Sequence, residues 1–303
     1  MAKHLLGYLL LSLAMALLAN PLSAAPATLA QMLEGAPSSA WRTPDPRHTL
    51  YLDLASGRVV IELAPRFAPR HVRNIESLAR ERYFDGLHII RVQDNYVVQW
   101  GDAEHRHPSP DSVRPAPPEF ERSWSEDMPF TPLPDGDVYA PQVGFSDGLP
   151  VAGDRKTRRI WLAHCYGMVG VGRDDAPTSG SGAELYVIIG HAPRHLDRNV
   201  ALVGRVLKGI ERLSSLPRGT AAMGFLDPPS SGVMIQRVRV QADVPAGERE
   251  HLEVLRTDTP AFESLVESRR NRRENWYVHP AGRIELCNVP IPVREVSGAL
   301  TTP

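Results

Sequence analysis

Residues that could do chemistry are spread thinly along this chain. The HExxH pattern of metalloproteases, a Walker-type phosphate loop and a GxGxxG turn with its acidic partner do not occur. Glu104, His105 and His107 could together ligate a metal ion, but they stand in a proline-rich stretch where solvated side chains are expected. We therefore predict no metal site and no cofactor.

A second candidate set is His164 beside Cys165, which could form a thiol-imidazole pair. Adjacent residues of a strand point to opposite faces, and this argues against the pairing. The chain has 2 cysteines, Cys165 and Cys287. Either they form a disulfide or they are two separate buried thiols, because their separation in sequence does not fix their distance in space.

The composition is that of a globular protein with one large core. Of its 303 residues, 42% are hydrophobic and 23% are charged, which predicts one main domain with additions. The net charge of -1 provides no field to attract nucleic acid or an anionic membrane. We therefore expect neither as a partner.

The first residues have the pattern of a targeting segment. Lys3 and His4 precede a mostly apolar run over 5–19, and small residues follow as far as Ala25. The run is shorter than the roughly 20 residues that span a bilayer. We assign 1–24 to a cleaved signal peptide and expect an exported, periplasmic protein without further contact to the membrane.

Apolar periodicity predicts short strands that close, or nearly close, into a β-barrel. A hairpin over 49–63 turns at Ser56 and Gly57, and a helix over 65–82 follows it. A second, short helix is expected over 206–216. The further predicted strands cover 87–92, 96–99, 160–171, 185–189, 200–206 and 234–240. Mainly β structure with two helices covering the barrel ends follows from this pattern.

Three segments lie outside this pattern. Residues 25–47 read as a surface arm. The stretch 103–159 is rich in proline, with 10 of the chain's 28, and has little periodicity, which is typical of a functional or disordered loop. Residues 246–303 form an appended extension with an amphipathic helix, whose basic run over 269–273 we expect on a solvated face. Four apolar residues could pack this extension on the main body: Trp276, Tyr277, Ile284 and Leu286.

Two long stretches resemble a known family. GRVVIELAPRFAPRHVRNIESLARERYFDGLHIIRVQDNYVVQWGD begins at Gly57, and GMVGVGRDDAPTSGSGAELYVIIGHAPRHLDRNVALVGRVLKGIERL begins at Gly167. They are similar to the two halves of a cyclophilin-type peptidyl-prolyl isomerase, in the same order. The resemblance covers roughly 48–243 and includes the family's RV, QxGD and LDxxxxxxGRV elements.

The resemblance implies a closed eight-stranded barrel, capped by two helices, with an outer groove that takes an X-Pro segment. Arg91 matches the family's catalytic arginine and Gln99 its polar partner. Gly172 and Arg173 match the edge that pairs with the substrate backbone. The proline pocket is matched by Tyr96, Val97, Tyr186 and Leu196, and Glu184 stands where the family has an amide.

This chemistry needs no nucleophile. Rotation about the amide has a barrier of roughly 18 to 20 kcal/mol, because nitrogen donates into the carbonyl. Arg91 can donate a hydrogen bond to the prolyl nitrogen or the carbonyl oxygen and favour the twisted form. We expect a neutral substitution of Arg91 to cost more rate than any other single change.

Several positions depart from the family pattern, so we predict an altered groove. Tyr96 and Tyr186 carry hydroxyl groups that need a partner or water. Glu184 is expected within reach of Arg91, where it would orient the guanidinium or compete for it. Four further departures are Val97 for a methionine, Trp100 for a glycine, His195 for an aromatic residue and Val200 for a histidine.

Three functions follow from these patterns. The first is an isomerase that acts on proline-containing segments of exported proteins. The alternative is a cyclophilin-like binding module or chaperone that holds such segments with little turnover. In the third, the protein is an envelope scaffold that contacts a partner through 246–303.

Overall fold

The computed structural model describes residues 28–102, 107–108, 110–111, 113–114 and 116–296. The predicted signal peptide, 1–24, lies outside these ranges, as do the candidate metal ligands Glu104 and His105.

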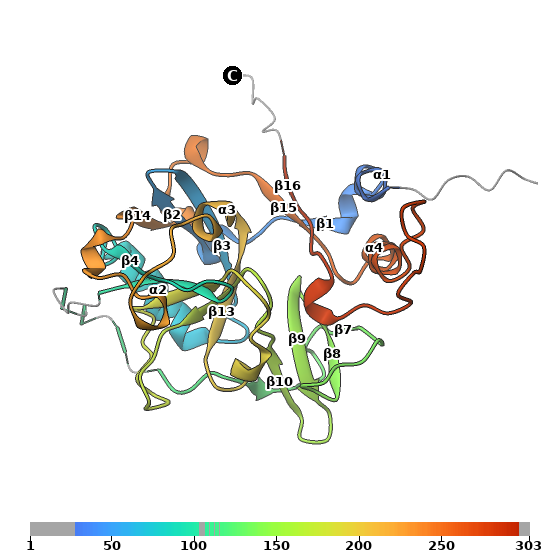
Figure 1. Cartoon of the computed structure of the whole chain (residues 1–303), viewed down its shortest axis with the longest axis horizontal. Helices are drawn as coiled ribbons and strands as arrows, with labels where there is room; N and C mark the ends of the chain where they lie inside the picture. Colours follow the sequence, from blue (N-terminus) through green and yellow to red (C-terminus); the bar gives the residue numbers. More distant parts are fainter. Residues whose placement is uncertain (1–27, 103–106, 109, 112, 115, 297–303) are drawn as a thin grey trace, which may run out of the picture.

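The largest sheet in the described ranges is an antiparallel barrel of eight strands (Figure 1). Its strands are β2 (Thr49–Leu54), β3 (Gly57–Leu63), β4 (His88–Val92), β5 (Val97–Gly101), β11 (Met168–Val171), β12 (Leu185–Ile188), β13 (Leu202–Lys208) and β14 (Ile235–Val240). They are hydrogen-bonded in the order β14-β2-β3-β13-β11-β12-β5-β4. A bridge between His88 and Met234 joins the two edges, so the barrel is nearly closed and the predicted fold class is confirmed.

Period-two patterning explains the first hairpin. Leu50, Leu52 and Leu54 point into the barrel core, whereas Tyr51, between them, packs in a small outer cluster. The turn between the strands ends at Gly57, whose φ of 123° is a conformation that favours glycine.

The two predicted helices accompany the barrel as α2 (Pro69–Arg80) and α3 (Glu211–Ser214). Helix α2 begins with Pro69 in its first turn. Its N-terminus is capped from a distant part of the chain, because the Glu119 carboxylate accepts the amide N–H groups of Arg70 and His71, each at 3.1 Å. Burial acts against the charge of Glu119, yet these bonds and the His71 ring at 2.7 Å hold its pKa below the ordinary value.

A second sheet lies beside the barrel, and the prediction of little regular structure in 103–159 is wrong from 122 onward. The strands are β6 (Arg122–Ser123), β7 (Thr131–Pro132), β8 (Gln142–Ser146), β9 (Leu149–Asp154) and β10 (Arg159–Leu162), in the order β6-β10-β9-β8-β7. The predicted strand 160–171 is divided between β10 of this sheet and β11 of the barrel. Short strands separated by prolines and glycines give a weak periodic signal, which explains the error.

The N-terminal arm and the C-terminal extension fold together. Strand β15 (Leu252–Leu255) lies between β1 (Trp41–Arg42) of the arm and β16 (Val293–Glu295). Helices α1 (Leu29–Glu34) and α4 (Pro260–Arg270) lie next to each other at the right of Figure 1. Short 3-10 helices connect the elements: η1 (Ser38–Ala40), η2 (Pro46–His48), η3 (Arg194–Leu196), η4 (Ala222–Gly224), η5 (Pro229–Ser231), η6 (Gln241–Asp243), η7 (Ala246–Glu248) and η8 (Leu286–Asn288).

These additions share a second hydrophobic core with the outer face of the barrel. It combines barrel residues such as Val97 and Tyr186 with Trp161 of the second sheet and with Trp41 and Phe262 of the terminal segments. We call the second sheet together with the arm and the extension the second lobe. A disulfide between Cys165 and Cys287 crosses this core, so the two cysteines are paired.

The extension differs in part from its predicted packing. Ile284 and Leu286 are buried, but Trp276 is 81% exposed. The basic run is not a uniformly solvated face, because Arg270 forms an ion pair with the buried Asp135 carboxylate at 2.6 Å. None of the helices in the described ranges is both long and apolar enough to cross a bilayer.

Candidate active site

One groove on the outer face of the barrel contains every site residue that the sequence predicted. Its cavity volume is about 630 Å³. It lies over β4, β5, β11 and β12 and is bordered by η3. The predicted residues that line it are Arg91, Tyr96, Val97, Gln99, Gly172, Arg173, Glu184, Tyr186 and Leu196. Their roles stay predictions, whereas their common location is a feature of the structure.

Strand register brings the central side chains together. Arg91 on β4 lies opposite Gln99 on β5, and Gln99 lies opposite Tyr186 on β12. Alternation along β5 turns Val97 and Gln99 toward the groove and turns Val98 and Trp100 inward. Trp100 is 1% exposed and packs in the barrel core, so the expectation that it reshapes the groove is wrong.

Arg91 is held at one end of the groove by three hydrogen bonds. Its Nε donates to the carbonyl of Met223 at 2.8 Å and its Nη1 to Oε1 of Gln99 at 3.3 Å, while Nη2 donates to Gln93. The guanidinium carbon also lies 5.2 Å from the ring centre of Phe225. Burial lowers the pKa of Arg91. A guanidinium has five N–H groups, so two of them have no protein partner in the described part of the chain.

Glu184 is engaged by Gln99. Gln99 Nε2 donates to Glu184 Oε2 at 2.9 Å, and this bond turns the amide oxygen of Gln99 toward Arg91. The carboxylate therefore orients Arg91 through Gln99, and the expected direct pair of Glu184 with Arg91 does not form within the described residues. Gly172 allows the close approach, since a Cβ atom there would lie 2.9 Å from the Cβ atom of Glu184.

Apolar side chains form the middle of the groove. Val97, Leu196 and Val200 line it together with the Tyr186 ring. Gly170 lies opposite Tyr186 on β11, and a Cβ atom there would be 2.2 Å from the ring carbon Cζ. A glycine at this position is thus required for the tyrosine ring to lie over β11. The resulting hollow suits the ring of a proline.

The Tyr186 hydroxyl has a buried partner behind the groove. It lies 3.0 Å from Nε2 of His164, whose Nδ1 lies 2.9 Å from Oδ1 of Asp197. The other oxygen of Asp197 accepts from Nε of Arg194 at 2.6 Å and from the Trp161 indole at 3.3 Å. Burial lowers the pKa of His164, against the opposing effect of Asp197, and burial raises the pKa of Tyr186. Neutral His164 therefore donates a hydrogen bond from Nδ1 to Asp197 and accepts one at Nε2 from the Tyr186 hydroxyl.

Three residues around Arg91 could not be predicted from the sequence. Met223, Phe225 and Gln93 surround the Arg91 guanidinium, and the first two come from the loop after α3. An isolated bridge pairs Arg91 with Phe225. This loop has no regular periodicity, so only the resemblance to a family could have marked it.

Other chemically suggestive residues have structural roles. Ser146 stands in a Gly-x-Ser-x-Gly sequence, but it is 0% exposed in the β8-β9 hairpin and its hydroxyl faces the Met128 sulfur at 3.8 Å. His107 donates its amide to Asp102 at 2.6 Å. In the part of the chain that the structure describes, no three His, Cys, Asp or Glu residues are arranged to hold a metal ion.

Comparisons with known proteins agree with this geometry. Residues 49–240 match the family model described as cyclophilin type peptidyl-prolyl cis-trans isomerase. A probable peptidyl-prolyl cis-trans isomerase of Brucella suis is 25% identical over 180 residues, which cover 59% of this chain and 76% of that protein. The peptidyl-prolyl cis-trans isomerase CYP23 of Arabidopsis thaliana is 29% identical over 174 residues, covering 54% of this chain and 62% of that protein.

A solved structure is similar over more than the barrel. The crystal structure of cyclophilin AquaCyp293 from Hirschia baltica superposes with a TM-score of 0.70 at 25% identity, and the match covers 89% of this chain and 98% of that one. The similarity therefore extends beyond the residues matched by the family model into the second lobe.

Proposed function

Because the chain belongs to the family of cyclophilin-type peptidyl-prolyl cis-trans isomerases, we propose that it uses Arg91 and the groove beside it to isomerise X-Pro bonds in exported proteins. The observation that carries the proposal is the row formed by Arg91, Gln99 and Tyr186 on three neighbouring strands. This row places a charged donor next to an apolar pocket, and both open into one groove.

Arg91 supplies an interaction that is stronger with the twisted amide than with the planar one. In the planar amide the prolyl nitrogen has no free lone pair, whereas in the twisted state it can accept a hydrogen bond. The two guanidinium N–H groups without a protein partner in the described residues can donate to this nitrogen or to the preceding carbonyl. An interaction made only in the twisted state lowers the barrier, and each ~1.36 kcal/mol of it is worth about tenfold in rate.

The groove holds the proline while the preceding bond turns. Val97, Leu196 and the Tyr186 ring offer an apolar surface, and strand β11 continues into Gly172 and Arg173 at the rim. Gln99 has both amide atoms bonded to protein groups, so its orientation is fixed before substrate arrives. This preorganisation reduces the cost of aligning Arg91 with the twisted bond.

Two observations support an exported, periplasmic location. The sequence begins with the pattern of a signal peptide, and the chain contains a disulfide between Cys165 and Cys287. Disulfides persist in oxidising compartments. A fusion of residues 1–40 to a reporter that is active only after export tests this location, and a reporter that stays inactive would contradict it.

The isomerase proposal is tested with a protein whose refolding is limited by proline isomerisation. We expect the wild type to accelerate refolding at catalytic concentrations and Arg91→Ala to lose most of this effect. Arg73→Ala, an exposed arginine on α2, is the matched control. A wild type that binds proline peptides without accelerating refolding would instead identify a binding module.

We also propose that the extension contacts a partner. Trp276 and Val278 are each 81% exposed. Deletion of 246–303 would remove part of the second core, so Trp276→Ala is the appropriate variant. Crosslinking in the periplasm should give a defined adduct in the wild type that Trp276→Ala lacks. An adduct of unchanged yield in the variant would contradict the proposal.

A further inference from the structure

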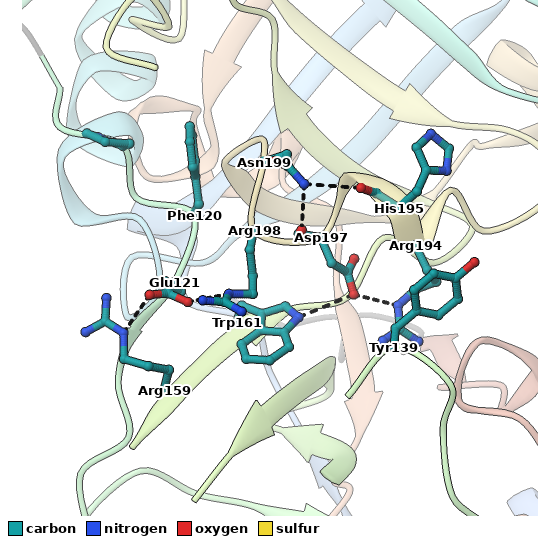
Figure 2. Close-up of a pocket in the computed structure, with 11 residues that line it drawn as sticks. Phe120, Glu121, Tyr139, Arg159, Trp161, Arg194, His195, Asp197, Arg198 and Asn199 are labelled. Carbon is teal, nitrogen blue, oxygen red and sulfur yellow. Dashed lines mark hydrogen bonds and ion pairs between the residues drawn. The ribbon is translucent and has the colours of Figure 1, made fainter. Parts of the chain in front are cut away.

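Next to the groove, a second hollow opens between the barrel and the second sheet (Figure 2). Its cavity volume is about 580 Å³, and it is lined by the rings of Phe120, Tyr139 and Trp161 among other residues. We propose that this hollow is a second subsite, which takes an aromatic side chain of the same polypeptide whose proline lies in the groove. The inference rests on the proposed function, because it assumes that a polypeptide occupies the groove.

The groove and the second hollow share a wall. Within the segment that begins at η3, Leu196 and Val200 line the groove, whereas His195, Arg198 and Asn199 line the second hollow. Arg173 crosses between them: it lines the groove, donates to the carbonyl of Asn199 at 3.0 Å and lies 5.6 Å from the ring centre of Phe120. A bound polypeptide that passes over this wall reaches the second hollow within a few residues of its proline.

The charges of the second hollow are already neutralised by one another. Glu121 accepts from both Arg159 and Arg198, as the left side of Figure 2 shows. Arg194 pairs with Asp197 at 2.6 Å and with Asp137 at 3.0 Å. Each of the three arginines that line the second hollow, Arg159, Arg194 and Arg198, has a carboxylate partner, so an acidic ligand would have to displace an existing ion pair. We therefore expect a neutral ligand.

The apolar part of the lining consists of aromatic rings next to guanidinium groups. Arg198 lies 5.0 Å from the ring centre of Trp161, and Arg194 lies 5.1 Å from that of Tyr139. Tyr139 is nonetheless 53% exposed, so part of its surface is open to a ligand. Flat faces of this kind suit another ring, through aromatic pairing and stacking on arginine. This favours Trp, Tyr or Phe over an aliphatic side chain.

The floor of the second hollow is held rigidly. Oδ2 of Asp197 receives hydrogen bonds from Nε of Arg194 at 2.6 Å and from the Trp161 indole at 3.3 Å. Figure 2 shows these two contacts meeting at the Asp197 carboxylate. A site that is ordered in advance loses less conformational entropy when it binds.

The test measures binding and turnover of synthetic decapeptides with one central Ala-Pro. Trp, Glu or Ala is placed at each of the three positions before and after this pair. We expect Trp at one of these positions to tighten binding to the wild type about tenfold over Ala, the effect of partly burying one aromatic side chain. Glu at the same position should give no gain.

Two variants assign the effect to the second hollow. Phe120→Ala and the half-exposed Tyr139→Ala should each reduce the ratio of Trp-peptide to Ala-peptide affinity to threefold or less. Tyr166→Ala removes an aromatic residue, 49% exposed, that does not line either hollow, and should keep the full ratio. Circular dichroism checks that each variant folds. If Phe120→Ala does not fold, Tyr139→Ala alone tests whether the preference for Trp arises in the second hollow.

Equal affinity of the wild type for the Trp and Ala peptides at every position would overturn the proposed subsite. A ratio of Trp-peptide to Ala-peptide affinity that is unchanged in Tyr139→Ala would overturn it as well. A larger gain from Glu than from Trp would overturn the aromatic class. A wild type that prefers the Trp peptide but turns over none of the peptides would support the subsite and refute the isomerase function, so the two failures can be told apart.

Discussion

The hydroxyl of Tyr186 and Nε2 of His164 lie 3.0 Å apart in the buried layer behind the groove. The ring of this tyrosine faces the substrate side, whereas its polar atom faces the protein. His164 is in turn bonded to Asp197, which also contributes to the floor of the second hollow. The Tyr186 hydroxyl therefore has a hydrogen-bond partner within the protein and does not face the substrate.

Tyr186→Phe should therefore affect stability more than turnover. The variant leaves Nε2 of the buried His164 without its partner, and we expect a loss of about 1 to 2 kcal/mol in the free energy of unfolding. Turnover should stay within about threefold of the wild type. Urea denaturation and peptide isomerisation measure the two effects, with Tyr166→Phe as the exposed control. A collapse of turnover at unchanged stability would mean that the hydroxyl acts on substrate.

His164 should make stability depend on pH below neutrality. Its pKa is lowered from 6.5 by burial, so the folded protein keeps it neutral where the unfolded chain takes up a proton. The contribution of neutral His164 to the free energy of unfolding is complete above pH 6.5. It is lost as the pH falls toward the lowered pKa, and the free energy of unfolding then changes by at most about 1.4 kcal/mol per pH unit.

His164→Asn removes this component, so its unfolding free energy should change less than that of the wild type between pH 7 and pH 5. The exposed His279→Asn serves as the matched variant and should follow the wild type. Parallel slopes for His164→Asn and the wild type would contradict the prediction.

Arg91→Ala should lower kcat/KM by about 10²- to 10³-fold, the usual cost of losing one preorganised donor to the transition state. Arg91→Lys keeps the charge but lacks the planar fork that reaches Gln99 and Met223 together, so it should be intermediate. Exchange spectroscopy on an Ala-Pro peptide measures both variants. Activity in Arg91→Ala equal to that of Arg73→Ala would exclude Arg91 from the reaction.

Glu184→Ala should reduce kcat/KM about three- to tenfold through Gln99. Without the carboxylate, Nε2 of Gln99 loses its acceptor, and the amide is free to turn its oxygen away from Arg91. Glu184→Gln retains an oxygen acceptor and should remain close to the wild type. Equal losses in both variants would show that the charge of Glu184, and not its hydrogen bond, is what matters.

The disulfide should stabilise the second lobe. It joins residues 122 apart in sequence, and the double variant Cys165→Ala/Cys287→Ala should lose about 2 to 5 kcal/mol of unfolding free energy. Urea denaturation with and without reductant gives the comparison. Reductant should destabilise the wild type and leave the double variant unchanged. Equal stability of the wild type and the double variant under oxidising conditions would show that the disulfide does not stabilise the protein.

The barrel could be predicted from the sequence, and so could the nine residues assigned to the groove, although Gln93, Met223 and Phe225 around Arg91 could not. Leu50, Leu52 and Leu54 alternate as a half-buried strand must, and the spacing from Arg91 to Gln99 sets two facing positions across a tight connection. Patterns of this kind depend only on residues that are close in sequence, so they can be predicted without knowledge of distant contacts.

Contacts between distant segments could not be predicted in this way. Glu119 caps a helix that begins 50 residues earlier, at Pro69, and nothing near either residue signals it. The short strands of the second sheet have too few residues to show a period. Similarity to a family pattern does not indicate which face of a strand a residue occupies, whereas strand alternation places the Trp100 side chain in the barrel core.

The pairing of Trp41 with Leu255 sets an order of events during synthesis. The ribosome makes the arm first, but its partner strand emerges roughly 10 to 40 s later at ordinary elongation rates. Every strand of the barrel has been made by then, since the last of them ends at Val240. Trp41 therefore lacks its partner strand until after every barrel strand has been made, which leaves the arm open to chaperones and proteases for longer than the barrel strands.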